Sequence, residues 1–378
     1  MAKLTAIPVG QGDAFLLERA DGKIVLVDGG RARSSLAGQV SLATSNIDVV
    51  VCTHADADHA EGLIGLLESS LVPIREVWLP GRWSSRLEDL CRDQASFLQE
   101  LHHDVHNAEG GADLEKIAEG ELPRGESTTD FDPELLGAAL EHEERLEPDL
   151  LSASAHPAWW LPWAEMWPGF HGPNAPKWQL WIDAVQTAVR IRDVARAAHH
   201  HGARLRWFDF DEVNVNRAPP SGGEPFLYPL NSVELTKRHA LRKLGALHFL
   251  ALSVANRESL VFLAPQTDDD TPVLFAADSD LACGRVPGTS RTLAVTAPHH
   301  GSEANKTAYV TVSRAAANVV WVRSDGNYKK RPGPAFLGEK ARVCTLCRSG
   351  GASKQTVRLD DTPSGWTLAE GVRGCNCK

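Results

Sequence analysis

The segment Thr53–His59, with the sequence THADADH, constrains this chain more than any other, because neither an ordinary core nor an ordinary surface needs it. It follows the apolar run Ile47–Cys52, which predicts a buried strand, and it precedes Gly62–Leu67, which predicts a helix. Two imidazoles and two carboxylates therefore crowd onto one strand-to-helix turn. Without a cation the carboxylates would repel each other, whereas bound metal ions make the crowding favourable. The pattern predicts a metal site rather than a loop that is rich in His and Asp by chance.

Length and composition set wider bounds on the chain. Its 378 residues are 43% hydrophobic and 23% charged, which allows a sizeable core in one large domain with insertions or in two domains. No N-terminal apolar run resembles a signal peptide, and no apolar stretch approaches the length of a membrane span. We therefore expect a soluble cytoplasmic protein that has no membrane partner.

Charge is distributed unevenly along the chain. The net charge of −10 argues against a protein that coats nucleic acid, although a local basic site remains compatible with it. Acidic residues concentrate between Glu100 and Asp149, and either charged region can be a solvated face. The basic residues that gather late in the chain are Lys329, Lys330, Arg331, Lys340, Arg342, Arg348, Lys354 and Arg358.

The first ninety residues alternate between predicted strands and helices. Strands are expected at Leu4–Val9, Ala14–Glu18 and Ile24–Val27, and a helix at Leu36–Ala43. This order predicts a sheet with helices packed outside it. The regularity stops near Leu90.

Residues 93–177 are predicted to be an insertion, acidic and helix-prone at first and then rich in Trp and Pro. Trp159–Trp163 and Trp167–Phe170 can stack on a ligand, form a lid or bind another protein, but aromatic residues more often pack an insertion onto its parent domain. A long amphipathic helix is expected next, at Lys177–His201, and then a strand at Arg204–Phe208. Further strands are expected at Ala246–Ser253, Ser259–Leu263, Val273–Ala277, Thr292–Thr296 and Val319–Arg323, with the last of these closing the core.

Four of the seven cysteines lie near the C-terminus. The Cys-x-x-Cys turn of Cys344 and Cys347 aims two thiolates at one ion, and Cys375 and Cys377 can complete a tetrahedron. In a reducing compartment this clustering favours metal over disulfides, with reduced and unliganded thiols as the alternative. The pattern resembles a small zinc-ribbon or zinc-knuckle tail. We expect one structural Zn²⁺ in residues 336–378, and a tail that can dock nucleic acid or protein.

The chain also resembles the metallo-β-lactamase-fold hydrolases, and within them the nuclease-type domains of competence DNA-uptake proteins. The segments that carry the resemblance, in the order of the family, are Val9–Ala14, Val27–Gly30, Thr53–Gly62, Asn256–Val261, Ala277–Asp278 and Pro298–Ser302. The resemblance implies an α/β fold, a four-layer αββα sandwich with metals at one edge of it. Residues 1–92 and 178–335 would form this core.

The resemblance also implies two divalent metal ions and their ligands. His54 and Asp56 would hold the first ion, and Asp58 and His59 the second. Asp278 would bridge both ions, while Asp28 would support the metal-binding loop. Either His299 or, as the alternative, His300 would complete the second site.

Two departures from the family pattern affect the expected chemistry. Asp56 stands where many members have histidine, and this oxygen donor shifts preference toward Mn²⁺, with Zn²⁺ still compatible. Arg331 precedes Pro332 where the competence-type pattern has histidine. A cation would therefore replace the histidine in its contact with the leaving group or the phosphate. Lys329 and Lys330 belong to the same loop and are candidate phosphate-binding residues, or only solubilising ones.

These features favour a dinuclear metal-dependent hydrolase, a phosphodiesterase or nuclease that cleaves DNA or RNA. Two cations would activate a bridging water for attack, and Asp58 would orient it. One alternative is a small-molecule phosphodiesterase or (thio)esterase with a Trp-rich lid. Another is a non-catalytic docking module, which the retained ligand pairs disfavour.

Overall fold

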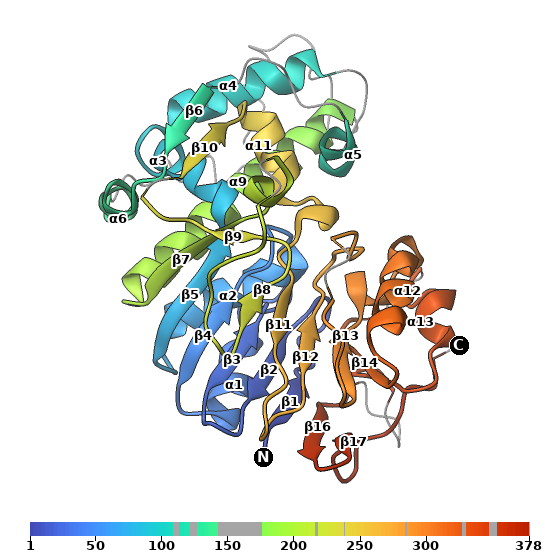
Figure 1. Ribbon diagram of the computed structural model, residues 1–378. Helices are drawn as coiled ribbons and strands as arrows, with labels where there is room; N and C mark the ends of the chain where they lie inside the picture. Colours follow the sequence, from blue (N-terminus) through green and yellow to red (C-terminus); the bar gives the residue numbers. More distant parts are fainter. Residues whose placement is uncertain are drawn as a thin grey trace.

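Two β-sheets packed face to face form the centre of the molecule, and helices cover their outer faces (Figure 1). The computed structural model describes residues 1–108, 113–120, 127–142, 176–215, 218–237, 239–283, 286–326, 330–347 and 354–377. The αββα order of layers confirms the predicted fold class.

The first sheet has nine strands within the described part of the chain, in the order β17-β16-β1-β2-β3-β4-β5-β7-β9. Their bounds are β1 (Lys3–Ala6), β2 (Phe15–Glu18), β3 (Ile24–Val27), β4 (Ile47–Val51), β5 (Ile74–Pro80), β7 (Arg204–Asp209), β9 (Val233–Glu234), β16 (Val357–Thr362) and β17 (Gly365–Leu368). Strands β3, β4, β5 and β7 are parallel, so their carboxyl ends lie at one edge. β4 is almost wholly buried, as is usual for a parallel strand that is covered on both faces.

The second sheet has six described strands, in the order β15-β14-β13-β12-β11-β8. Their bounds are β8 (Tyr228–Pro229), β11 (Phe262–Ala264), β12 (Val273–Phe275), β13 (Leu293–Thr296), β14 (Val319–Arg323) and β15 (Arg342–Cys344). Strands β12 to β15 are parallel, which again brings their carboxyl ends to one edge.

Three buried apolar clusters hold the four layers together. The cluster between the sheets includes the aromatic side chains of Phe15, Trp78, Phe208, Phe262 and Phe275. Helices α1 (Leu36–Ala43), α2 (Ala57–Ser69) and α9 (Pro176–His200) cover the first sheet, and α12 (Lys306–Ala315) and α13 (Pro334–Gly338) cover the second. Burial of each large apolar side chain contributes about 1.5–3 kcal/mol, so these clusters are the main source of stability.

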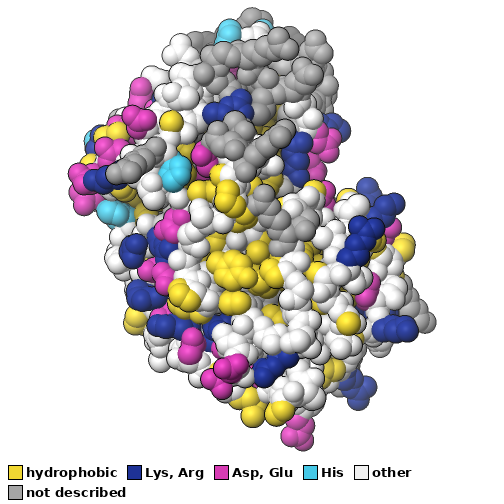
Figure 2. Space-filling view, viewed as in Figure 1, with side chains coloured by type: hydrophobic (Ala, Val, Ile, Leu, Met, Phe, Trp, Pro, Cys, Tyr) yellow, Lys and Arg dark blue, Asp and Glu magenta, His cyan; other side chains and the backbone are white. Residues whose placement is uncertain are grey.

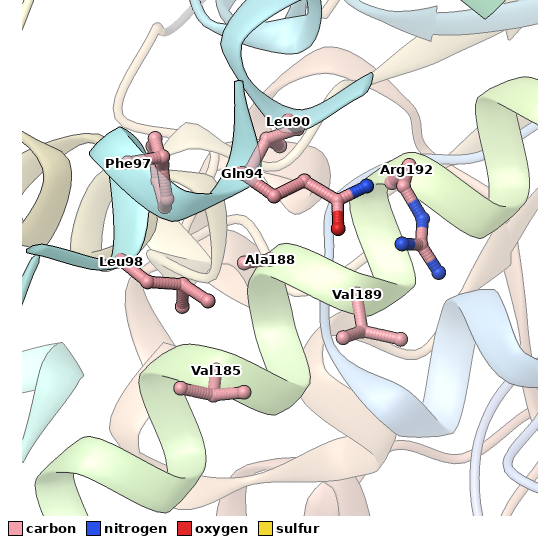
Figure 3. A pocket seen from close by; sticks show the side chains of 8 residues that line it. All are labelled: Leu90, Gln94, Phe97, Leu98, Val185, Ala188, Val189 and Arg192. Atoms are coloured by element: carbon pink, nitrogen blue, oxygen red, sulfur yellow. The ribbon is translucent and has the colours of Figure 1, made fainter. Parts of the chain in front are cut away.

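A helical lobe packs against α9 beyond the first sheet (Figure 1). It comprises α3 (Leu87–Arg92), α4 (Gln94–Asn107), α5 (Leu114–Glu119), α6 (Pro133–Leu140), α11 (Ala246–Ser253) and the antiparallel pair β6 (Ser127–Asp130) and β10 (Ala240–Lys243). Figure 3 shows apolar side chains of α4 and α9, among them Phe97, Leu98 and Val185, around a small cavity. The described part of the predicted insertion therefore packs on its parent domain. Short helices at Gly81–Ser85 (η1), Phe210–Val215 (α10), Asn256–Glu258 (η3) and Glu303–Asn305 (η5) connect other elements.

Two secondary-structure predictions are wrong. Ala246–Ser253 forms helix α11 rather than a strand, because a short run that is apolar on every side fits a buried helix as well as a buried strand. Val319–Arg323 does not close the core, since β15 joins the second sheet and β16 pairs with β1. The segment 336–378 thus contributes strands to both sheets. Its strands are short or carry charged residues, which hides them in the sequence.

The Trp-rich stretch, residues 159–170, lies outside the described residues. None of the helices that the structure describes is both long enough and apolar enough to cross a membrane.

Candidate metal centre

The candidate site forms where the carboxyl ends of parallel strands from the two sheets meet. In the first sheet, Asp28 follows β3, and the segment Thr53–His59 runs from the end of β4 into the first turn of α2. In the second sheet, Asp278 follows β12, and β13 leads into the short turn η4 (Pro298–Gly301) that carries both adjacent histidines. Strand ends of this kind are where α/β folds commonly place ligands, because the connecting loops converge there.

Three buried imidazoles point the same nitrogen atom into this site. The Nδ1 atom of each is already engaged: that of His54 lies 3.0 Å from Thr53 Oγ1, that of His59 2.7 Å from Asp28 Oδ2, and that of His300 2.9 Å from Asp13 Oδ1. The three Nε2 atoms are buried and make no hydrogen bond with the described residues. Buried polar atoms without a partner are costly, so this arrangement fits a ligand that the three Nε2 atoms share.

Asp278 lies between these three imidazoles and that of His299, and each of its two oxygens faces two of the four rings. Oδ1 lies 3.1 Å from His59 Nε2 and 3.8 Å from His300 Nε2. Oδ2 lies 3.9 Å from His54 Nε2 and 3.7 Å from His299 Nε2. A carboxylate with this geometry can bridge two cations.

The ligand atoms fall into two groups that share Asp278. His54, Asp56 and Asp278 form one group, and Asp13, His59, Asp278 and His300 form the other, with the ligand atoms of each group within 4.8 Å of one another. Asp58 is adjacent to the second group, because its Oδ2 lies 3.4 Å from His300 Nε2. We call Asp13, His54, Asp56, Asp58, His59, Asp278, His299 and His300 the His/Asp cluster. The donor set and the unpartnered Nε2 atoms fit two divalent metal ions.

The two neighbouring histidines of η4 differ in their surroundings. His300 is fully buried and faces Asp58 and Asp278 Oδ1. His299 is a quarter exposed, and its Nδ1 lies 3.2 Å from Asn305 Oδ1. Both residues have positive φ values, 46° and 53°, and this turn directs the two rings to different oxygens of Asp278. His300 therefore faces the group that contains His59, whereas His299 lies beside the oxygen that faces His54.

Two buried carboxylates, those of Asp28 and Asp13, contact the Nδ1 atoms of His59 and His300. Asp28 accepts hydrogen bonds from the Thr53 backbone amide and hydroxyl at 2.9 and 2.8 Å and contacts His59 as well. Asp13 plays the corresponding part for His300, and sequence reasoning did not assign it. Its signal was the Gly-x-Gly-Asp turn: Gly12 has φ 106°, and a Cβ there would lie 1.8 Å from the Asp58 carbonyl oxygen. Only glycine lets this turn approach the metal-binding loop so closely.

The electrostatics of the His/Asp cluster favour bound positive charge. Burial lowers the pKa of His59, but the Asp278 and Asp28 carboxylates outweigh burial and raise this pKa well above its usual value. Asp13 and Asp278 raise the pKa of His300 against burial in the same way. Burial raises the pKa of Asp278, but His59, His299 and His300 hold it well below its usual value. The bridging carboxylate therefore stays ionised and attracts cations, whether imidazole protons or metal ions.

Arg331 lies at the rim of the His/Asp cluster with its side chain only 8% exposed. Its guanidinium is 3.8 Å from Asp58 Oδ2 and 3.5 Å from Asp325 Oδ2. Lys330 is exposed on the preceding position, and Lys329 lies outside the described residues. Of the three basic residues predicted for this loop, Arg331 is the one seen next to the site.

One open cavity is lined by residues of the His/Asp cluster, and a second one includes Ser279, the residue after Asp278. One, of about 350 Å³, is lined by Asp56, Asp58, Arg31, Arg190 and the acidic residues Asp113, Glu115 and Asp183. The other, of about 650 Å³, is lined by residues that include Ser279, Asp280 and Arg257. Both cavities present both signs of charge.

The four C-terminal cysteines come together at a second place. Cys344, Cys347, Cys375 and Cys377 have their sulfur atoms within 4.8 Å of one another, and we call them the Cys cluster. His239 and His248 lie in the helical lobe, the first just before β10 and the second on α11. Neither belongs to the groups of potential ligands found among the described residues.

Comparison with known proteins places the sequence in one family. Residues 7–203, more than half of the chain, match the family model described as the metallo-beta-lactamase superfamily. A comparison with curated proteins gave no match. The matched residues contain Thr53–His59, and members of this family are mostly metal-dependent hydrolases that bind divalent ions, typically zinc. The narrower resemblance to competence proteins stays a prediction, but the chain belongs to the metallo-β-lactamase superfamily.

Proposed function

We propose that this chain is a two-metal hydrolase of phosphodiesters, with a nucleic-acid strand as its first candidate substrate. The observation that carries the proposal is the Asp278 carboxylate, whose two oxygens each face two imidazoles, beside the nearly buried guanidinium of Arg331. Imidazole and carboxylate donors suit Zn²⁺ or Mn²⁺. A guanidinium beside such a site suits a phosphate group, which it can bind through two hydrogen bonds.

In this proposal Asp278 would be a ligand of both ions. The first ion would be held by His54, Asp56 and Asp278 Oδ2, with His299 beside that oxygen, and the second by His59, His300, Asp58 and Asp278 Oδ1. Asp13 would support His300, since its Oδ1 already contacts the ring on the opposite side. When bound, two such ions lower the pKa of a water molecule and neutralise charge that develops on a phosphoryl oxygen.

The side chains at the rim of the cluster would orient the reactants. Burial raises the pKa of Asp58, but the imidazole of His300, whose Nε2 lies 3.4 Å from Asp58 Oδ2, outweighs it and holds this pKa far below its usual value. Asp58 therefore stays ionised and can accept a hydrogen bond from an attacking water. Arg331 would bind a phosphoryl oxygen and stabilise the charge that builds up in the transition state.

Nucleic acid as the substrate is supported by basic residues near the site and by the resemblance to competence-type nucleases. Lys354 Nζ lies over Gly10, 3.2 Å from the position that a Cβ would occupy there, in the turn that precedes Asp13. Lys330 is exposed beside Arg331. Because phosphate contacts release counterions, binding of a nucleic-acid strand by these residues should weaken steeply with salt.

A small phosphodiester that carries a cationic group is the second candidate substrate. The cavity beside Asp56 and Asp58 is lined by Asp113, Glu115 and Asp183, which would repel a polyanion but attract a cation. On the face seen in Figure 2, the described Lys and Arg side chains are likewise interspersed with Asp and Glu.

The experiment that tests the proposal is hydrolysis in the presence of Mn²⁺ or Zn²⁺. Bis-p-nitrophenyl phosphate would be compared with single-stranded DNA, double-stranded DNA and RNA. We expect Asp58→Ala to lower kcat/KM by at least about 100-fold, the typical size of a lost proton-transfer or orienting group. Asp360→Asn, which changes a partly exposed carboxylate that pairs with Arg358 on β16 and belongs to neither candidate site, is the matched control and should leave hydrolysis unchanged.

The outcomes distinguish the two candidate substrates. Cleavage of a polynucleotide that disappears in Asp58→Ala supports a nuclease. Cleavage of the small ester alone supports the second candidate. Equal hydrolysis by Asp58→Ala and the parent protein would contradict both.

A further inference from the structure

The Cys cluster has the dimensions of a tetrahedral thiolate site. Cys347 Sγ lies 3.3 Å from Cys377 Sγ and 3.8 Å from Cys375 Sγ, and Cys344 Sγ lies 3.7 Å from Cys377 Sγ. A tetrahedral ion with bonds of about 2.3 Å to sulfur separates its ligands by about 3.8 Å. A disulfide would need about 2.05 Å, so these four thiols are spaced as ligands of one ion.

The Cys cluster is also connected to the His/Asp cluster through Thr345. This residue follows Cys344 directly, is buried, and donates its backbone amide to the Arg323 carbonyl at 3.1 Å. Its hydroxyl lies 3.4 Å from both the backbone amide and the carbonyl oxygen of Asp325. The Cys-x-x-Cys turn therefore holds the loop that follows β14.

Asp325 in turn holds two arginines that reach the His/Asp cluster. Its Oδ2 accepts from Arg323 at 2.7 Å and lies 3.5 Å from Arg331 Nε. Arg323 Nε donates to the His300 carbonyl at 2.6 Å, and Arg331 lies 3.8 Å from Asp58. Only two residues, Thr345 and Asp325, thus separate a cysteine ligand from the rim of the cluster.

Hydrogen bonds also join the segment that carries Cys375 and Cys377 to residues in and next to the Cys-x-x-Cys turn. Gln355 donates its backbone amide to the Thr345 carbonyl at 2.7 Å and its side chain to the Cys344 carbonyl at 3.0 Å. Cys375 donates its amide to the Arg342 carbonyl at 2.9 Å, and the Asn376 amide donates to Cys347 Sγ at 3.2 Å. An amide that donates to sulfur is a usual partner of a metal-bound thiolate.

We propose that Cys344, Cys347, Cys375 and Cys377 bind one zinc ion, and that this ion, through Thr345 and Asp325, positions Arg331 at the rim of the His/Asp cluster. Thr345 is then a positioning residue. Zinc binding by the cysteines stands on their geometry alone, whereas its effect on phosphate binding and turnover rests on the proposed function.

Zinc binding is tested by replacing the ion with cobalt in the full chain. Thiolate ligands give Co²⁺ an intense charge-transfer absorption that His and Asp ligands do not give, so the Cys cluster is seen separately from the His/Asp cluster. We expect this absorption to saturate at one Co²⁺ per chain and to disappear on addition of one equivalent of Zn²⁺. Cys377→Ser should lose it, and Cys283→Ser, which removes a cysteine outside the cluster, should keep it. Its absence from the parent protein would overturn the proposal, even if Cys377→Ser fails to fold.

Positioning is tested with Thr345→Val, in which the hydroxyl is lost but the shape is kept. The measurement is the calorimetric affinity of inorganic phosphate for the zinc-loaded protein. We expect Thr345→Val to keep the cobalt absorption and to bind phosphate about threefold to tenfold more weakly, the effect of about one hydrogen bond, with Thr345→Ser restoring the affinity. In hydrolysis, kcat/KM should fall, because Arg331 would contact the phosphoryl group both in the bound substrate and in the transition state.

Two results would overturn the positioning role. One is unchanged phosphate affinity in Thr345→Val, and the other is a parent protein that binds no phosphate. Phosphate binding that responds to Thr345→Val without hydrolysis of any ester would instead count against the proposed function and leave the positioning role supported.

Discussion

The His/Asp cluster and the Cys cluster are built in opposite ways. The His/Asp cluster collects residues from Asp13 to His300 at the edges of two sheets, and each of its three buried imidazoles is fixed through Nδ1. The Cys cluster joins one short turn to the C-terminal residues, and its sulfur atoms mainly face one another. The fold therefore assembles the first cluster, whereas bound metal would have to hold the second together.

The largest effect is expected from Asp278→Asn, which removes the shared carboxylate and keeps its shape. We expect hydrolysis to fall by at least about 1,000-fold, because several kcal/mol of charge stabilisation by the two ions is lost. Metal analysis should show that the His/Asp cluster has lost its ions while the Cys cluster keeps its zinc. Hydrolysis within tenfold of the parent protein would show that Asp278 does not bridge the ions.

A smaller effect is expected from Asp28→Asn, which changes a residue behind the ligands. Loss of the carboxylate that orients His59 should weaken metal binding by about 10–100-fold, the usual effect of such a supporting group. Titration against a competing chelator measures this affinity. Asp360→Asn is again the matched control. Equal metal affinities in the two variants would show that Asp28 does not orient His59 for metal binding.

The Cys cluster should respond to metal removal in a different way. A thiol-directed chelating treatment should make the chain after residue 354 more sensitive to proteolysis and lower Tm by a few degrees at most, since about 1 kcal/mol corresponds to about 2–4 °C at 150–250 residues and to less in a longer chain. The strands β3 and β4 should stay protected, because their packing does not depend on that ion. Mass spectrometry of the fragments checks both expectations, and early cuts near β4 would contradict them.

The smallest effect concerns the pH dependence of stability with metal removed from the His/Asp cluster. The raised pKa values of His59 and His300 contribute stability that is present below their ordinary value of about 6.5 and is lost as pH rises through the raised values. The lowered pKa of Asp278 contributes stability that is present above about 3.8 and is lost as pH falls through the lowered value. Stability should therefore be highest between about pH 4 and 6.5.

Thermal unfolding in chelator, followed from pH 4 to pH 9, measures this dependence. We expect Tm to fall at alkaline pH and added metal to restore it, with most effect where protons no longer compete for the imidazoles. The surface variant His239→Asn should show the same profile as the parent protein. A Tm in chelator that rises steadily up to pH 9 would contradict the charge balance described for the cluster.

Much of the His/Asp cluster could be predicted from the sequence because its ligands follow strands. The segment Thr53–His59 comes directly after an apolar run, and Asp278 and His300 follow two others, so the carboxyl ends of parallel strands bring them together. The choice between His299 and His300 could not be predicted, since it depends on the positive φ values of a turn. The contact of Asp13 with His300 could not be predicted either, because it joins residues 287 positions apart.

The C-terminal part of the chain shows where the sequence was least informative. β15 has three residues, and β16 carries charged side chains, so neither gives a clear strand pattern. The sequence alone predicts that the charged residues Arg323 and Asp325 are exposed, but both side chains are fully buried. Buried charges are recognisable only once their partners are known, because pairing is what makes their burial tolerable.

The proposed sharing of Asp278 by two ions can be tested by anomalous diffraction from crystals grown with Mn²⁺ or Zn²⁺. We expect two anomalous peaks about 3.5–4 Å apart, as in other two-metal sites, one near each oxygen of Asp278. The peak near Oδ2 would adjoin His54, and the peak near Oδ1 would adjoin His59 and His300. A single peak, or none beside Asp278, would show that this carboxylate is not shared by two ions.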